Sequence, residues 1–354
     1  MKSKIIIMLL SVVLVTISCK KKIEEFPNTT TEEVVLVDEE WDDVEEDEYD
    51  NINGKGWYDI SVLYVYNFTG YIDDIYAFDM QLFVSSEDIS GKYYYLSKEK
   101  NIRVEGTLKD GHLKLTEEFG NTFKGVFDYE KGTIKGEWSN ITTGAVMPFS
   151  MANPKGKGYP WNKYKAYMVL EGGSDDTYTV MRLAEIDKNG KVKFKSITSS
   201  SRIDGGEEPD FPITLQDYNF DGYLDICAFE FYASYPPNKY QYLLYDSKED
   251  DYVFNQEFDN EIYSEASGTN FRKNLIYETT EGPRGSSDIF QVINGKIKVV
   301  YSWYNGGYPN EDGEIEGDTI PYYFKYNQDK QIEITKEEFE KIYGLNALGG
   351  DLYY

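Results

Sequence analysis

Residues 212–231 read Pro-Ile-Thr-Leu-Gln-Asp-Tyr-Asn-Phe-Asp-Gly-Tyr-Leu-Asp-Ile-Cys-Ala-Phe-Glu-Phe, an oxygen-rich loop between two apolar segments. Side-chain oxygens recur at alternate positions in Asp217, Asn219, Asp221 and, after the backbone carbonyl of Tyr223, in Asp225. Asp and Asn oxygens on short stems, at this spacing, are the ligands that Ca²⁺ takes in tight loops. Both flanks are rich in β-branched and aromatic residues, so the sequence predicts a strand, a calcium loop and a second strand.

The loop begins like an EF-hand but does not end like one. Its twelfth position is Ala228, where an EF-hand requires a bidentate Glu. Gly222 supplies the positive φ that folds the loop back on itself. The alternative is an Asp/Asn/Gly hairpin turn that binds no metal. The alternate spacing favours Ca²⁺ over that alternative, because a turn alone does not need an oxygen at every second position.

The composition is acidic and aromatic. Among 354 residues, 36 Lys and Arg stand against 63 Asp and Glu, which gives a net charge of −27. Such a charge makes nucleic acid and anionic membrane surfaces unfavourable partners and would attract a basic protein. The alternative is that most of the excess of Asp and Glu over Lys and Arg serves to keep exposed faces solvated, which requires no partner. The 33 tyrosines and 19 phenylalanines favour strands.

The N-terminus carries the pattern of a targeting signal. Lys2 and Lys4 precede an apolar run, residues 5–17, which is too short to span a membrane. The run ends just before Cys19 in a sequence that resembles the lipobox of bacterial lipoproteins, so residues 1–19 are predicted to be a lipoprotein signal peptide and Cys19 the lipidated residue. Secretion with ordinary cleavage is the alternative. The predicted location is the bacterial cell envelope, with the lipid anchor in the outer membrane and the chain on its periplasmic or surface face.

The rest of the chain divides into a tether and two β regions. Residues 20–53 are strongly acidic and are predicted to be a disordered tether, with a recognition tail containing Trp41 as the alternative. Residues 54–152 read as a β-meander or partial barrel, because short alternating segments are joined by Gly-containing turns. Residues 160–354 read as a second, propeller-like β domain that contains the calcium loop. The predicted fold class is all-β.

Catalytic chemistry has little support in the sequence. Cys227 follows the calcium loop in an apolar run and is predicted to be a buried strand thiol. The one histidine, His112, lies in a predicted hairpin turn. No zinc motif, nucleophile elbow or phosphate-binding loop is present, and no pair of carboxylates stands out, so the chain is predicted not to be an enzyme.

The calcium loop, the apolar strand after it and the segments 234–238 and 240–246 resemble integrin-type propeller repeats. They are also similar to small bacterial lipoproteins with a propeller-like fold, some of which neutralise lysozyme-like hydrolases. The resemblance implies a calcium-stabilised lipoprotein that binds a macromolecule and inhibits such a hydrolase. Tyr235 and Asn238 are then the candidate partner-binding residues, because prolines between them stiffen the loop.

Two further sequence features bear on function. Ser90-Gly-Lys-Tyr93 is similar to a short motif of lysozyme inhibitors, although it fits the start of a strand better. The alternative function is binding of surface glycan or host matrix, with Trp161 or Trp303 stacking on sugars.

Overall fold

We describe a computed structural model of the chain. The structure describes residues 58–98, 100–159, 164–171, 178–186, 192–199, 211–231, 239–262, 265–266, 268–280, 286–306, 320–327 and 330–343. The strands are β1(Tyr58–Ile60), β2(Val62–Ile72), β3(Tyr76–Ser85), β4(Asp88–Tyr95), β5(Asn101–Lys109), β6(His112–Glu117), β7(Thr122–Asp128), β8(Thr133–Ser139), β9(Val146–Ala152), β10(Tyr164–Glu171), β11(Tyr178–Ile186), β12(Val192–Ser199), β13(Ile213–Gln216), β14(Asp225–Phe231), β15(Lys239–Asp246), β16(Asp251–Phe254), β17(Gly268–Asn270), β18(Leu275–Thr280), β19(Ser286–Ile293), β20(Lys296–Gly306), β21(Ile320–Asn327) and β22(Lys330–Ile334). The helices are α2(Gln256–Glu261) and α3(Lys336–Tyr343).

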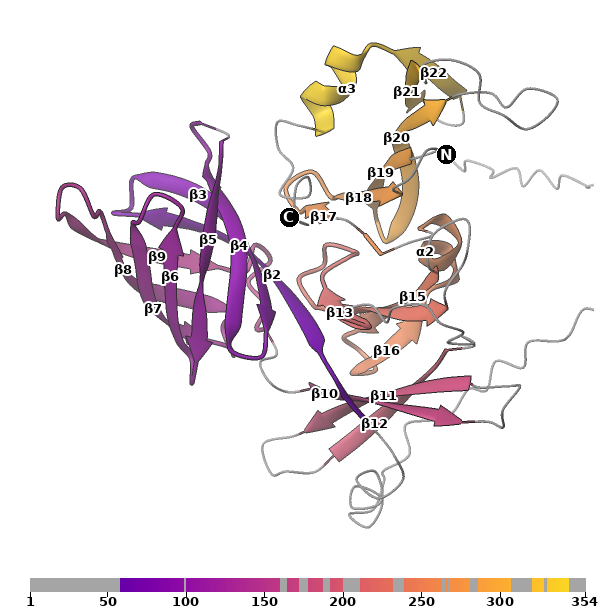
Figure 1. The fold of residues 1–354 in the computed structure, drawn as a ribbon, viewed down its shortest axis with the longest axis horizontal. Coiled ribbons are helices and arrows are strands. Elements are labelled where there is room, and N and C mark those ends of the chain that lie inside the picture. The colour runs from indigo at the N-terminus through magenta and orange to yellow at the C-terminus, as the bar shows by residue number, and fades with distance from the viewer. Residues whose placement is uncertain are drawn as a thin grey trace, which may run out of the picture. The chain divides into compact units, whose positions relative to one another are not determined.

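Strands β2 to β9 form a closed antiparallel barrel (Figure 1). Each strand pairs with the next, and β2 also pairs with β9, with Thr69 opposite Ala152 and Ile72 opposite Phe149. Inward positions carry large apolar side chains, and Tyr66, Phe68, Phe78 and Phe123 are fully buried. The all-β prediction is confirmed, and the predicted meander closes completely. Because aromatic side chains fill the interior, the barrel is a packed core.

Glycines in three barrel strands allow neighbouring strands to approach closely. Gly106, Gly125 and Gly136 continue the pairing without a register shift, and Gly125 lies opposite Gly136. A Cβ on Gly136 would lie 1.9 Å from the backbone oxygen of Lys124. Glycines that interrupt strands predict bulges or a curved, barrel-like sheet. The structure has the curved sheet, closed into a barrel.

Short turns connect the barrel strands as the sequence predicted. At the hairpin between β5 and β6, Asp110 and Gly111 have φ of 49° and 78°. Positive φ at both central residues defines the turn that matches the twist of two antiparallel strands, and Asp-Gly is a preferred sequence for it. Lys109 and His112 pair directly across this turn.

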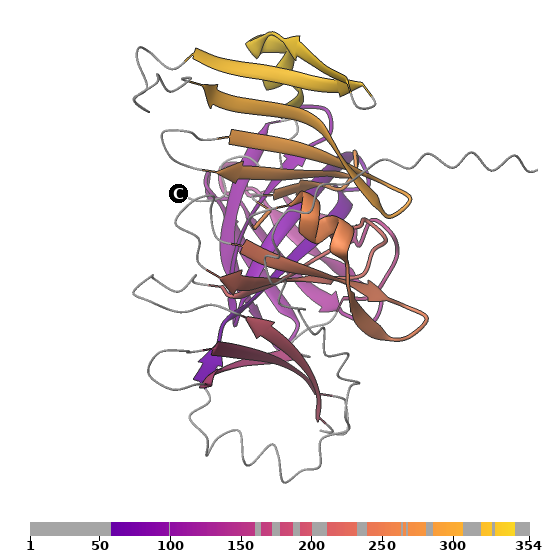
Figure 2. The same ribbon diagram turned by 90° about the vertical axis from the view of Figure 1, so that its right-hand side faces the viewer.

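The remaining described strands form three successive antiparallel groups. Strands β10 to β12, together with β1, make a four-stranded sheet. Strands β17 to β22 make a six-stranded sheet, which is coloured orange to yellow in Figure 2. Strands β13 to β16 extend the barrel sheet, because β13 pairs in parallel with the first half of β2. A propeller arrangement of these groups is not shown and stays a prediction.

Two helices accompany the strands. The spacing of Thr335 and Glu338 predicts a helix at residues 335–343, and α3 confirms it. The backbone N–H of Glu338 donates to Thr335 Oγ1 at 3.2 Å, which is one of the two bonds of a capping box. The sequence did not predict α2, where Asn255 caps the helix by accepting from the backbone N–H of Phe258. Within the described residues, neither helix has the length and apolar character that crossing a bilayer requires.

Candidate functional site

The predicted calcium loop, residues 217–225, lies between β13 and β14 and is called the acidic loop below. The strands on either side are antiparallel, with Gln216 opposite Asp225. Gly222 has a φ of 98°, and Phe220 also has a positive φ, 60°. Gly222 therefore supplies the left-handed backbone that the sequence predicted for it. The strand, loop and strand arrangement is confirmed.

Asp217 and Asp225 are turned into the loop by backbone donors. The N–H groups of Asp221 and Gly222 donate to the two oxygens of Asp217, at 3.0 and 2.9 Å. Asp225 Oδ2 accepts from Tyr218, and its Oδ1 accepts from the N–H of Tyr245 on β15 at 2.9 Å. Asp217 is 7% exposed and Asp225 is fully buried. Asp225 thus holds the loop against a neighbouring strand.

The other two oxygen donors lie nearer to solvent. Asn219 Oδ1 accepts from the N–H of Asp221 at 2.9 Å, and Asp221 Oδ1 accepts from the N–H of Tyr223 at 2.9 Å. The Asn219 amide also donates to Asp221 Oδ2. Each carboxylate or amide oxygen carries two lone pairs. Asp217, Asn219 and Asp221 therefore keep acceptor capacity after these bonds are made.

Burial and mutual repulsion disfavour the charged forms of the two inner carboxylates. Burial, followed by the negative charge of Asp221, raises the pKa of Asp217 to about 7, although the N–H donors and Lys155 act in the opposite direction. Burial, followed by the charge of Asp217, raises the pKa of Asp225 well above its usual range. A bound divalent cation would offset this repulsion, and the donors are all oxygens, which Ca²⁺ prefers.

The described geometry is not a complete ligand cage. Among the residues that the structure describes, no group of three or more His, Cys, Asp or Glu side chains is arranged to hold a metal ion. Calcium binding by Asp217, Asn219, Asp221, Tyr223 and Asp225 therefore stays a prediction. The chemistry of the donors fits Ca²⁺, because all of them are oxygens.

The acidic loop packs against the segment that leaves the barrel, residues 153–159. The side-chain amide of Asn153 donates to the carbonyl of Gly222, and the Lys157 ammonium lies 4.8 Å from the centre of the Tyr223 ring. Tyr159 is buried and donates to the carbonyl of Asn67 on β2 at 2.7 Å. Glycine and proline concentrated in residues 152–160 predict a linker. Its described part connects the loop and the barrel through side-chain contacts.

A second feature, which the sequence reasoning missed, lies at the opposite end of the barrel. Seven of the eleven exposed large hydrophobic side chains in the described residues lie in or beside the four turns at this end. We call them the apolar rim: Tyr71, Ile75, Tyr76, Leu96, Phe119, Ile141 and Val146. Ile75, Phe119 and Ile141 are the most exposed, at 69%, 61% and 68%. Each follows a polar turn residue, and that pattern is the signal in the sequence.

Contacts between the turns hold the apolar rim in place. The backbone N–H of Ile141 donates to Asn121 Oδ1 in a neighbouring turn, at 3.2 Å. The Lys100 ammonium lies 5.9 Å from the centre of the Phe119 ring, and the rings of Tyr76 and Tyr95 pack edge to face. Beneath them, Glu117 accepts from Tyr93, Trp138 and Asn121, each at 2.7 Å.

The remaining sequence predictions have mixed outcomes. Cys227 is a buried free thiol on β14, as predicted, and burial raises its pKa well above the usual range. Trp303 packs, half-buried, against the cluster of Leu275, Tyr277, Ile289 and Phe339, so part of its ring is used in packing. Cys19, Trp41, Trp161, Tyr235 and Asn238 lie outside the described residues. Their predicted roles stay predictions.

Comparisons with known proteins add little to this description. No protein-family model and no curated protein matches the sequence. Among solved structures, a Xanthomonas type IV secretion system related protein aligns with 65% of this chain and 97% of its own, at 12% identity and a TM-score of 0.30. Similarity at that level supports no argument about function. The resemblance to integrin-type repeats and to lysozyme-inhibitor lipoproteins has no support from these comparisons.

Proposed function

We propose that this chain is a calcium-stabilised lipoprotein, anchored through Cys19 in the bacterial cell envelope, that binds another protein with its apolar rim. The observation that carries the proposal is the gathering of exposed apolar side chains at one end of the barrel. Scattered surface hydrophobics need no explanation, but a contiguous group in polar turns marks an interaction site. The function is binding, without catalysis.

The apolar rim suits a protein partner because its side chains are large and its turns are short. Aromatic and aliphatic anchors at the centre of an interface contribute most of the binding energy. The turns are braced by the bond between Ile141 and Asn121 and by the Lys100 contact with Phe119. Little conformational entropy is then lost on association.

The partner that we propose is a basic protein, and a lysozyme-like cell-wall hydrolase is the specific candidate. A net charge of −27 would steer a basic protein toward this chain and speed association at low salt. The acidic loop would supply stability, with Ca²⁺ neutralising Asp217 and its neighbours. The Tyr235 loop, which the resemblance implies as a binding element, is a second contact to test.

The test uses a soluble chain without residues 1–19, which lacks both the apolar run and the lipidated Cys19, mixed with a panel of basic muramidases. Binding and muramidase activity are measured with Ca²⁺ and with a chelator. Phe119→Ser and Ile141→Ser remove rim anchors, and Val253→Ser is the matched control because Val253 is 51% exposed on β16, outside the barrel. We expect the rim variants to weaken binding at least about tenfold, the loss of one or two interface anchors.

The outcomes separate the parts of the proposal. Binding that is lost in the rim variants and kept in the control supports the rim as the interface. Equal binding by all three variants overturns the assignment of the apolar rim as the interface. The next variant to test is then Tyr235→Ala. If no panel member binds, the hydrolase is the wrong partner, and if chelator leaves the melting temperature unchanged, the calcium assignment fails.

A further inference from the structure

The outer face of β6, β7 and β8 carries a group of basic side chains on an acidic protein. Side chains on a strand alternate between the two faces, and here Lys114, Lys124 and Lys135 all point outward and are exposed. His112 lies at the start of β6 on the same face. We call these four residues the basic face. Three adjacent strands thus place three lysines on one outer face of a protein whose net charge is −27.

Like charges lie beside one another on the basic face. Lys114 and Lys124 are direct cross-strand partners, and like charges in that position destabilise a sheet. In the described part of the chain, none of the three lysines forms an ion pair, although Glu137 lies opposite Lys124 in the register. Other barrel lysines do have partners, since Lys109 pairs with Glu87 and Lys131 with Asp128. Packing gives no reason for the cluster, because these side chains are exposed.

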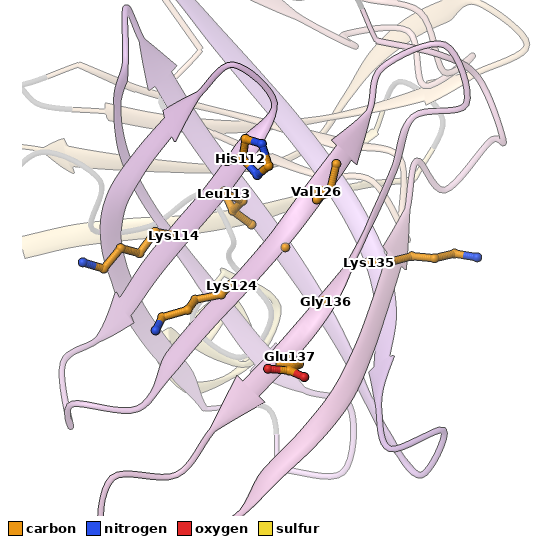
Figure 3. Close-up of a pocket in the computed structure, with 9 residues that line it drawn as sticks. His112, Leu113, Lys114, Lys124, Val126, Lys135, Gly136 and Glu137 are labelled. Atoms are coloured by element: carbon orange, nitrogen blue, oxygen red, sulfur yellow. The ribbon is translucent and has the colours of Figure 1, made fainter.

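The basic face surrounds a shallow hollow of about 460 Å³. Its floor includes Gly125 and Gly136, which lie opposite each other, and the side chain of Val126. One acidic residue, Glu137, also lines the hollow. Figure 3 shows Lys114 and Lys124 extending to one side of the hollow and Lys135 to the other. A chain laid across the strands would therefore meet ammonium groups on both sides.

We propose that the basic face binds an anionic polysaccharide that carries carboxylate or sulfate groups. Lysine ammonium groups are flexible point charges that suit repeated acidic groups on an extended chain. The open, shallow shape of the hollow accommodates such a chain along its length. A bilayer surface fits less well, because large apolar side chains would have to enter the lipid. Most exposed side chains of that kind in the described residues lie at the apolar rim, and Val126 is the one on the basic face. This site does not depend on Ca²⁺ or on the protein partner proposed above.

The test measures binding of a defined sulfated oligosaccharide by the full chain in non-ionic detergent, with neutral dextran as the uncharged probe. Measurements at low and at physiological salt give the salt dependence. The variants are Lys124→Gln and the combination of Lys114→Gln, Lys124→Gln and Lys135→Gln. Lys131→Gln is the control, since it removes one exposed lysine that is paired with Asp128. Vesicles that contain phosphatidylglycerol test the lipid alternative.

We expect the parent to bind the sulfated probe and not dextran, with an affinity that falls as salt rises. Each lysine removed should weaken binding about two- to fivefold, the strength of an exposed ion pair, and lower the salt slope by roughly one. The triple variant should melt at the same or a higher temperature, because its cross-strand repulsion is gone. Absence of binding by the parent, undiminished binding by the triple variant, or capture of vesicles in preference to the oligosaccharide would each overturn the proposal.

Discussion

The side-chain amide of Asn153 donates a hydrogen bond to the backbone carbonyl of Gly222, 2.9 Å away, and joins the end of the barrel to the middle of the acidic loop. The loop is therefore not an isolated turn on the second β region. Asn153 is 3% exposed, so water does not readily replace the lost partner when the bond is broken.

Asn153→Ala should lower the melting temperature by several degrees and reduce the stabilisation that Ca²⁺ provides. Loss of a buried hydrogen bond costs about 1–3 kcal/mol, and Gly222 would no longer be fixed at the loop's sharpest bend. Calorimetry with and without Ca²⁺ checks both effects. Asn140→Ala is the control, because Asn140 also bonds backbone N–H groups but in a turn at the rim end. An equal loss of the calcium effect in both variants would contradict the coupling.

Asp221→Asn should weaken calcium binding while changing the melting temperature in chelator only slightly. Asp221 is exposed and retains an oxygen for the Tyr223 N–H after the substitution. Asp225→Asn should lower calcium affinity and also destabilise the chelated protein, because both Asp225 oxygens accept backbone N–H groups. Titration calorimetry and melting curves distinguish the two. Identical behaviour of the parent and Asp221→Asn in calcium would count against a metal site here.

Calcium binding near pH 7 should release protons. The pKa of Asp217, raised to about 7 by burial and by the charge of Asp221, leaves this carboxyl partly protonated there, and a cation binds the ionised form. Affinity should therefore fall as pH drops below 7. Calorimetric titrations in buffers with different ionisation enthalpies measure the proton release. A binding enthalpy that is independent of the buffer would show that no carboxyl loses a proton.

Glu265→Gln should stabilise the protein above pH 7 and have little effect near pH 4.5. Burial raises the pKa of Glu265 to about 7 from an ordinary 4.5, while a hydrogen bond from Thr214 acts in the opposite direction. The folded state thus binds this proton more tightly than the unfolded state. Its stabilising effect is complete below pH 4.5 and is lost as pH rises through 7, at a cost of roughly 1–3 kcal/mol.

Melting curves across that pH window measure the effect of Glu265→Gln. Glu333→Gln, on the exposed edge strand β22, is the control for removal of one negative charge. Glutamine keeps an oxygen that can accept from Thr214, so the comparison isolates the proton. A difference between parent and Glu265→Gln that stays constant from pH 4.5 to 8 would show that Glu265 does not titrate in this way.

Gly136→Ala should destabilise the barrel severely. Its Cβ would lie 1.9 Å from the Lys124 oxygen and 2.5 Å from the Cα of Gly125, so the backbone of β7 would have to move. We expect a loss of several kcal/mol, within the range of strong overpacking. Gly144→Ala is the control, because it has no neighbour within 4 Å and only its φ of 70° opposes a side chain. Comparable melting temperatures for the two variants would refute the close-approach argument.

Local pattern predicted those parts of the fold that depend on neighbours in the chain. The strands from Asn101 to Ser139 and the turn at Asp110 and Gly111 follow from alternation and turn chemistry, and the acidic loop follows from the spacing of its oxygens. The pairing of β2 with β9 and of β13 with β2 did not follow, because it joins residues far apart in sequence. The sequence of a short strand does not by itself specify which other strand it will pair with.

The candidate sites were predictable to different degrees. The oxygen donors of the acidic loop lie within nine consecutive residues, so a single stretch of sequence was enough to predict the site. The apolar rim draws one to three residues from each of four turns, and the basic face draws one lysine from each of three strands. Each of these residues is unremarkable by itself, and only the strand order makes them neighbours.

Strand β2 also has a consequence for how the chain folds. Its second half completes the barrel with β9, but residues 62–65 have β13 as a partner on the same edge, and β13 begins at Ile213. At a synthesis rate of about 5–20 residues per second, β13 is made several seconds after β9. During that interval the barrel can close while this short edge has open hydrogen-bonding groups. Nascent chains that stop before Ile213 should therefore be prone to edge-to-edge association, a hazard that the finished protein no longer has.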